Sequence, residues 1–243
     1  MYGGIWMRNE VADARQVRRE LTGYRLIPSR FPPISIYAGL VANDRIDSLV
    51  EIENLTNPRL KAAQRLTSVE DLEPSNRLQN WNHAPFAYSN PEGSLFFGAD
   101  RPCLELASDK QTALAISVAR RQRFLSRTDE PAVGLDMRML ATPICGTFLD
   151  LRHLGAGLTH DERRAIGMTV PTSTQGVLYT APERPSGECV AVLDGGVLGR
   201  SLQANHYRFL WDGQKMISLY AFDNEGRAFS PDMLSSDEDI LAA

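Results

Sequence analysis

The sequence predicts one domain in which strands and helices are mixed. Two strand–turn–strand patterns indicate hairpins, one from Gly176 to Leu193 and one centred on Asp212-Gly213. A helix is predicted from Asp109 to Leu125, with Asp109 as its N-cap. No internal repeat and no linker divides the 243 residues, so we expect one hydrophobic core.

The composition is that of an ordinary globular protein, with 43% hydrophobic and 23% charged residues. The net charge of -4 argues against direct contact with nucleic acid, which requires a basic surface. No run approaches the roughly 18 apolar residues of a membrane span, and the first residues lack the apolar core of a signal peptide. We therefore expect a cytoplasmic protein that makes no contact with a membrane.

Metal binding is not predicted. The three cysteines, Cys103, Cys145 and Cys189, are far apart, and the four histidines form no HxxxH pair. We interpret the cysteines as small buried side chains.

The N-terminal region divides at Gly23. Residues 8–20 are charged and carry apolar residues at helical spacing, so residues 1–22 are predicted to form a short, solvated helical extension. Residues 24–27 begin the main domain as a strand. Because Arg25 lies between apolar neighbours on this strand, we expect its guanidinium to reach a pocket or a carboxylate.

The middle of the chain is predicted to be mainly helical. Helices are expected at residues 45–55 and 59–66, followed by a surface loop at 67–78. A turn follows at residues 90–93, before the helix that Asp109 begins. The basic end of that helix is interpreted as a solvated face that suits a helix C-terminus; it contains Arg120, Arg121 and Arg123.

The second half is predicted to be rich in strands. Residues 133–151 read as a strand with one buried face, and residues 159–167 as a short helix capped by Thr159. The hairpin at 176–193 holds an exposed loop at the mouth of a sheet, where small ligands often bind, although a plain surface hairpin gives the same pattern. The main domain ends at residue 229, and the acidic tail from residue 230 to 243 is expected to be mobile.

Four segments of the chain resemble the RES-domain family, whose members are mostly toxins of bacterial toxin–antitoxin pairs. The resemblance spans residues 24–215, and the opening matches a longer subgroup of the family. The matching segments read YRLIPSRFPPI, WNHAPFAYSNPEGSLFFGADRPCLELAS, LDMRML and GVLYTAPERPSGECVAVL.

The resemblance implies the fold and the chemistry. It implies an α+β domain similar to ADP-ribosyltransferases, built on a mixed, mostly antiparallel sheet with flanking helices. It also implies a cleft that binds NAD+ as substrate or ligand and breaks its nicotinamide–ribose bond. An antitoxin-like protein is the implied partner, and self-association of the chain is a further implied contact.

Few of the family's site residues are retained. Arg25 occupies the position of an active-site Arg, with Arg30 close by. The other positions of the implied NAD+ cleft are substituted: the family has Arg at Leu95, a Tyr pair at Leu104 and Glu105, Glu at Ile116, Ser at Ala181 and Arg at Glu183. Thr180 and Ser117 each lie one position from a lost group.

Two functions remain open from these substitutions. In the first, the chain is a pseudoenzyme that binds a partner or a nucleotide through a degenerate NAD+ cleft, because an aliphatic side chain neither polarises nor clamps a substrate. In the second, it is an active NAD+-degrading toxin whose site is rearranged, with Glu105 as the substitute carboxylate. A strand shift of one residue turns a side chain to the other face of the sheet, so Glu105 requires a local bulge to substitute for the lost group.

Overall fold

The computed structural model describes residues 11, 13–29, 80–87, 90–222 and 226–241. The helices predicted at 45–55 and 59–66, the loop at 67–78 and Arg30 lie outside these residues. The described helices are α4 (Asn80–Ala87), α5 (Lys110–Leu125) and α6 (His160–Thr169). The strands are β1 (Gln16–Pro28), β2 (Leu104–Ala107), β3 (Val133–Asp150), β4 (Gly176–Thr180), β5 (Glu188–Val192), β6 (Leu202–Trp211), β7 (Met216–Ala221) and β8 (Ala228–Phe229).

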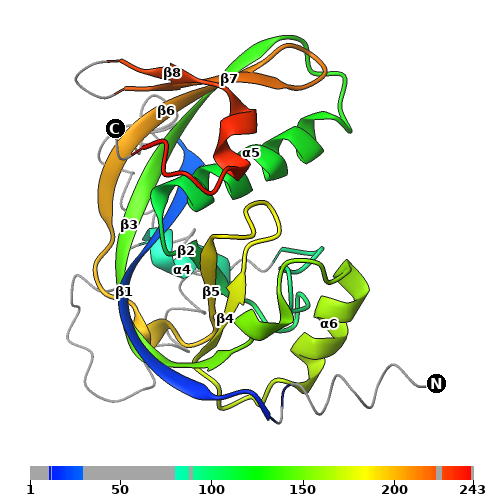
Figure 1. The fold of residues 1–243 in the computed structure, drawn as a ribbon, viewed down its shortest axis with the longest axis vertical. Coiled ribbons are helices and arrows are strands. Elements are labelled where there is room, and N and C mark those ends of the chain that lie inside the picture. Colours follow the sequence, from blue (N-terminus) through cyan, green and yellow to red (C-terminus); the bar gives the residue numbers. More distant parts are fainter. Residues whose placement is uncertain (1–10, 12, 30–79, 88–89, 223–225, 242–243) are drawn as a thin grey trace, which may run out of the picture.

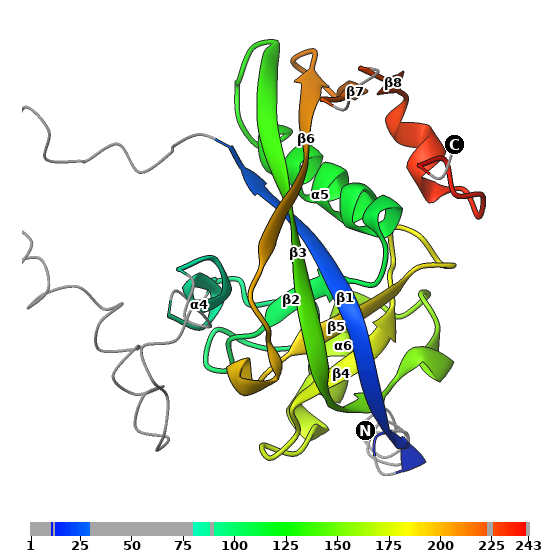
Figure 2. The same cartoon turned by 90° about the vertical axis from the view of Figure 1, so that its left-hand side faces the viewer.

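The eight strands form one sheet in the order β1-β2-β5-β4-β3-β6-β7-β8. An additional pairing of β1 with β3 closes the first five of these strands into a ring, from which β6, β7 and β8 extend (Figures 1 and 2). All the pairings are antiparallel except that between β3 and β4. The predicted α+β fold with a mixed, mostly antiparallel sheet is therefore confirmed.

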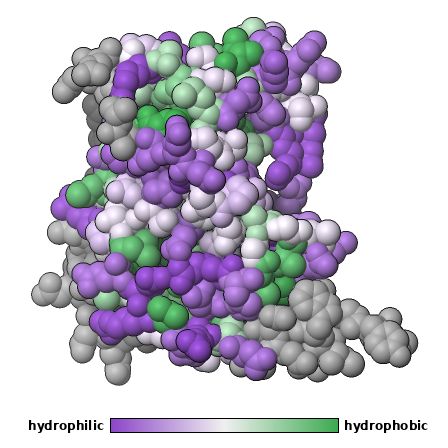
Figure 3. Space-filling model, in the orientation of Figure 1, coloured by the Kyte–Doolittle hydropathy of each residue, from purple (hydrophilic) through white to green (hydrophobic). Residues whose placement is uncertain are grey.

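Side chains on the two faces of the ring strands enter two separate cores, because successive residues of a strand point to opposite faces. The smaller core lies inside the ring and includes Leu104, Leu106, Ile144, Phe148 and Val190. The larger core lies outside it, between the sheet and α5, and includes Ala107, Leu114, Met139, Tyr179 and Phe209. On the face seen in Figure 1, hydrophobic residues are scattered among hydrophilic ones (Figure 3).

The helix predicted for residues 8–20 is wrong from Gln16 onward. Gln16 begins β1, and this strand pairs with β3 along its whole length, from Gln16 opposite Leu149 to Pro28 opposite Met137. This long pairing outweighs the helical spacing of a few apolar residues. The strand continues through Gly23, so the predicted boundary between an extension and the main domain does not exist at that point.

Residues 230–241, the described part of the C-terminal tail, are also packed rather than mobile. Residues Pro231–Ser235 form a 3₁₀ turn in which Leu234 is buried, and Ile240 and Leu241 pack against the larger core. These apolar residues, spaced through an acidic segment, are the sequence feature that indicates packing. The acidic composition alone had indicated mobility.

The helix caps follow the sequence closely. The Asp109 carboxylate accepts the Thr112 N–H at 2.8 Å, and Thr159 forms a reciprocal capping box with Glu162 at the start of α6. None of the described helices is long and apolar enough to cross a membrane. Cys145 is exposed on β3, contrary to its prediction as a buried side chain, whereas Cys189 is buried.

Candidate functional site

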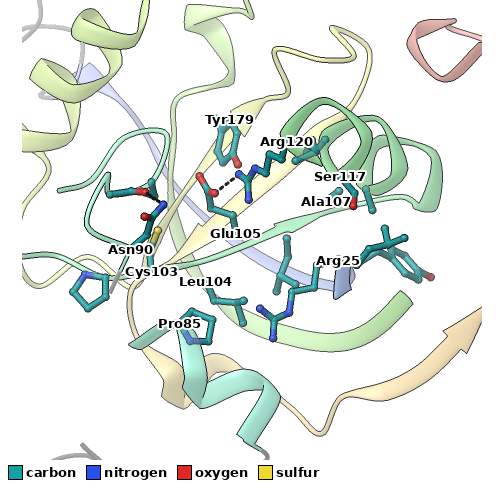
Figure 4. A pocket seen from close by; sticks show the side chains of 18 of the residues that line it. Arg25, Pro85, Asn90, Cys103, Leu104, Glu105, Ala107, Ser117, Arg120 and Tyr179 are labelled. Carbon is teal, nitrogen blue, oxygen red and sulfur yellow. Dashed lines mark hydrogen bonds and ion pairs between the residues drawn. The ribbon is translucent and has the colours of Figure 1, made fainter. Parts of the chain in front are cut away.

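A cavity of about 400 Å³ lies between β1, β2, the loop before β2 and α5. Its walls include Arg25, Cys103, Glu105 and Arg120 (Figure 4). Arg101 and Ile116 also line it. Four arginines line the cavity, and Glu105 is the only acidic side chain among the described residues that line it. The volume falls within the range of roughly 300–1,000 Å³ that is usual for small-ligand sites.

Glu105 lines the cavity from β2. Its side chain is 11% exposed, and its carboxylate forms an ion pair with Arg120 while Oε1 accepts the N–H of Leu95 at 3.1 Å. The Glu105 charge raises the pKa of Arg120, whose side chain is 50% exposed. Burial, followed by the Glu105 charge, raises the pKa of the adjacent Tyr179, which keeps this phenol neutral. The carboxylate therefore already has a cationic partner and a backbone donor.

One face of α5 forms the opposite wall. The helical period of 3.6 brings residues three or four apart to the same side, so this face repeats along the helix. Its members are Ala113, Ile116, Ser117, Arg120, Arg121 and Phe124. Ile116 and Ser117 thus both line the cavity.

Arg120 and Arg121 are the site residues that sequence reasoning missed. We interpreted them as part of a solvated face, but both line the cavity, and burial lowers the pKa of Arg121. The usable signal was spacing, because Arg120 lies four residues after Ile116 and therefore one turn along the same face. Arg123, in contrast, is exposed and does not line the cavity.

Arg25 lines the cavity from the other side of the sheet. Its neighbour Tyr24 pairs with Ala107, which shares a face of β2 with Glu105, so Arg25 and Glu105 point to opposite faces. Figure 4 shows Arg25 beside Leu104 and Pro85, apart from the ion pair of Glu105 with Arg120. Burial lowers the pKa of Arg25 to about 10, which still leaves it charged at neutral pH.

The remaining predicted positions lie elsewhere. The Leu95 side chain packs against the larger core, and only its backbone N–H contacts Glu105. Ala181 is completely buried in the same core. Thr180 lines a separate, open hollow near Arg152, whose carbonyl oxygen accepts a hydrogen bond from the Thr180 hydroxyl at 3.4 Å. Residues Leu95, Thr180 and Ala181 therefore do not form one site with the cavity residues.

Two further cavity groups are chemically restricted. Burial raises the pKa of the Cys103 thiol to about 12, so the nucleophilic thiolate is almost absent at neutral pH. Arg101 donates to the carbonyl oxygens of Val170 and Pro171, each at 2.7 Å, and thereby secures the chain that follows α6. In the part of the chain that the structure describes, no three His, Cys, Asp or Glu side chains are grouped so that they could hold a metal ion.

Comparisons with known proteins show the family of the chain. The family model described as RES domain matches residues 74–212. An uncharacterized protein of Sinorhizobium fredii, y4oC, is 55% identical over 219 residues, which cover 90% of this chain and 95% of the relative. The toxin–antitoxin complex MbcT-MbcA of M. tuberculosis contains a chain that is 13% identical, with a TM-score of 0.42 and coverage of 96% of both chains. From the family match and the relative, the chain belongs to the RES-domain family.

Proposed function

We propose that this protein is a RES-family member of a bacterial toxin–antitoxin or defence system, and that it binds a nucleotide without cleaving NAD+. The observation that carries the proposal is the α5 wall, where the aliphatic Ile116 lines the cavity. The family resemblance implies a Glu at this position. Ala181, at the position of the family's Ser, is buried outside the cavity. An antitoxin-like protein is the proposed partner of the chain.

The chemistry of NAD+ cleavage explains why these two positions matter. Breaking the nicotinamide–ribose bond leaves a sugar with oxocarbenium character, which a nearby carboxylate stabilises. An isoleucine offers no charge for this purpose. Glu105 is the acidic group that the described cavity wall supplies, and its oxygens are engaged by Arg120 and by the Leu95 N–H.

The cavity retains features that suit a nucleotide. Guanidinium groups bind phosphate oxygens through several N–H donors, and Arg121 supplies such a group from α5, while Arg25 supplies one from the other face of the sheet. Tyr24 and Tyr179 also line the cavity and add aromatic rings with hydroxyl groups to it. NAD+ contains both a diphosphate and planar rings, so these residues fit NAD+ as a ligand.

An active enzyme with a rearranged site is the second candidate, and the position of Glu105 favours it. Glu105 lines the cavity and is not fully buried, so its carboxylate reaches the space that a ligand would fill. In this candidate, a ligand phosphate attracts Arg120 away from Glu105 and frees the carboxylate.

Calorimetric titration of NAD+ into the purified protein tests the proposal. We expect binding that weakens about tenfold or more in Arg121→Met, because each charge-assisted hydrogen bond contributes roughly 1.5–3 kcal/mol. Arg123→Met, on the same helix but outside the cavity, is the matched control and should bind as the unaltered protein does. Absence of binding, or equal losses in both variants, contradicts the nucleotide assignment. Nicotinamide release that Glu105→Gln abolishes selects the second candidate.

A further inference from the structure

The C-terminal segment Ser230–Leu241, here called the C-terminal strap, lies across the beginning of α5 (Figure 1). Its 3₁₀ turn buries Leu234, which is 1% exposed, and Ile240 and Leu241 pack further along on the larger core. The strap is therefore bound to the domain at both of its ends, although its composition is acidic.

Gln111, in the first turn of α5, holds the main chain of the strap. The residue is 1% exposed, and its Nε2 lies 3.0–3.3 Å from the carbonyl oxygens of Leu234, Ser236 and Glu238. Its Oε1 accepts the N–H of Ile240 at 2.9 Å. A buried amide satisfied in this way recognises the path of the backbone, not the side chains that the backbone carries.

Arg184, from the loop between β4 and β5, holds the strap from the other side. Its Nε donates to the Ser236 carbonyl oxygen at 3.0 Å and its Nη2 to that of Asp237 at 3.4 Å. Its Nη1 lies 3.2 Å from the Asp109 carboxylate and 3.1 Å from the Thr112 hydroxyl oxygen. One guanidinium, 7% exposed, thus joins the strap, the loop and the N-cap of α5.

These contacts set where α5 lies relative to the loop. Asp109 caps the helix through Thr112, and a Cβ atom added to Gly187 would lie only 2.2 Å from the Thr112 hydroxyl oxygen. The loop and the helix start are therefore in closest contact at this point. One to two turns further along, the same helix carries Ile116 and Arg120 into the cavity.

We propose that the C-terminal strap is an internal peptide ligand that positions α5, and that Gln111 and Arg184 form its binding site. The site takes a short segment with one buried leucine and recognises its carbonyl oxygens. Arg184 acts as a positioning residue, because it lines none of the cavity itself. The inference goes beyond the proposed function, because the strap binds to the domain whether or not a ligand occupies the cavity.

Supplying the strap as a separate peptide tests the proposal. In a chain ending at Phe229, a synthetic peptide of residues 230–243 should bind saturably, as measured by fluorescence anisotropy. A peptide carrying Leu234→Asp should bind about tenfold or more weakly, because a buried leucine contributes roughly 1.5–3 kcal/mol. A peptide carrying Asp237→Asn should bind within about fivefold, since its carbonyl oxygen is the recognised group and an exposed charge contributes at most about 1 kcal/mol.

Hydrogen exchange gives a second readout that uses no cavity ligand. In the shortened chain, amides of residues 109–115 and 181–187 should exchange about tenfold faster, an effect of the size expected from the loss of one helix N-cap. The added peptide should restore their protection. If the shortened chain does not fold, Gln111→Met in the full chain takes its place. This variant should accelerate exchange at the same residues, and Arg123→Met is its control. Unchanged exchange at these residues, an equal acceleration in α6, or failure of the peptide to bind a folded shortened chain overturns the proposal.

Discussion

The substitution Gly23→Ala tests how closely β1 approaches the interior of the ring. A Cβ atom added at Gly23 would lie 2.7 Å from Cδ1 of Ile144 and 2.8 Å from Cβ of Leu106. Both contacts are well inside van der Waals distance, and the backbone-proximal Leu106 atom has little freedom to move. Inserting a methyl group into a packed core costs about 1–3 kcal/mol, which for a chain of this size corresponds to a Tm lowered by about 2–12 °C.

Thermal unfolding followed by circular dichroism measures this effect. Gly157→Ala is the matched control, because a Cβ atom there meets no atom within 4 Å. The control should unfold at the original temperature or slightly above it, since alanine restricts the unfolded chain. Equal melting temperatures for the two variants would show that β1 does not approach Ile144 and Leu106 as closely as described.

Further predictions concern side chains on either side of the ring. Because burial raises the pKa of Cys103 to about 12, its thiolate fraction at pH 8 is about one in ten thousand. Iodoacetamide should therefore alkylate the exposed Cys145 before the partly buried Cys103, as mapped by peptide mass spectrometry, and preferential labelling of Cys103 would contradict its raised pKa. Ser201→Ala should lower the free energy of unfolding by about 1–3 kcal/mol in chemical denaturation, because the buried Ser201 hydroxyl lies 2.6 Å from both Asn82 Oδ1 and Thr142 Oγ1. The exposed Ser173→Ala is its control, and equal stabilities would argue against the buried network.

Local signals predicted much of the fold. Asp109 and Thr159 identified the starts of α5 and α6, because an N-cap satisfies backbone donors that lie within three residues of it. The hairpin of β4 and β5 followed from its apolar runs and its Pro/Gly-rich break. The failure at β1 has the opposite origin, because its pairing partner β3 lies more than a hundred residues away and no local pattern reports it.

The candidate site was less predictable than the fold. The position of Ile116 was identified through the family resemblance, whereas the arginines of α5 were assigned to solvent because charge at a helix end is usually solvated. Which carboxylate meets which guanidinium depends on the arrangement of β2 against α5. For this reason the structure was needed to identify Arg120 as the ion-pair partner of Glu105.

Nicotinamide release from NAD+, monitored by chromatography, tests most directly whether the cavity binds NAD+ without cleaving it. The unaltered protein should release no more nicotinamide than a buffer blank. The variant Ile116→Glu places a carboxylate on the α5 wall, so it should release more nicotinamide than the blank, provided that circular dichroism shows a retained fold. Ser117→Ala, adjacent on the same wall, serves as the control for α5 packing and should release none. Steady nicotinamide release by the unaltered protein, with multiple turnovers per molecule, would contradict the account.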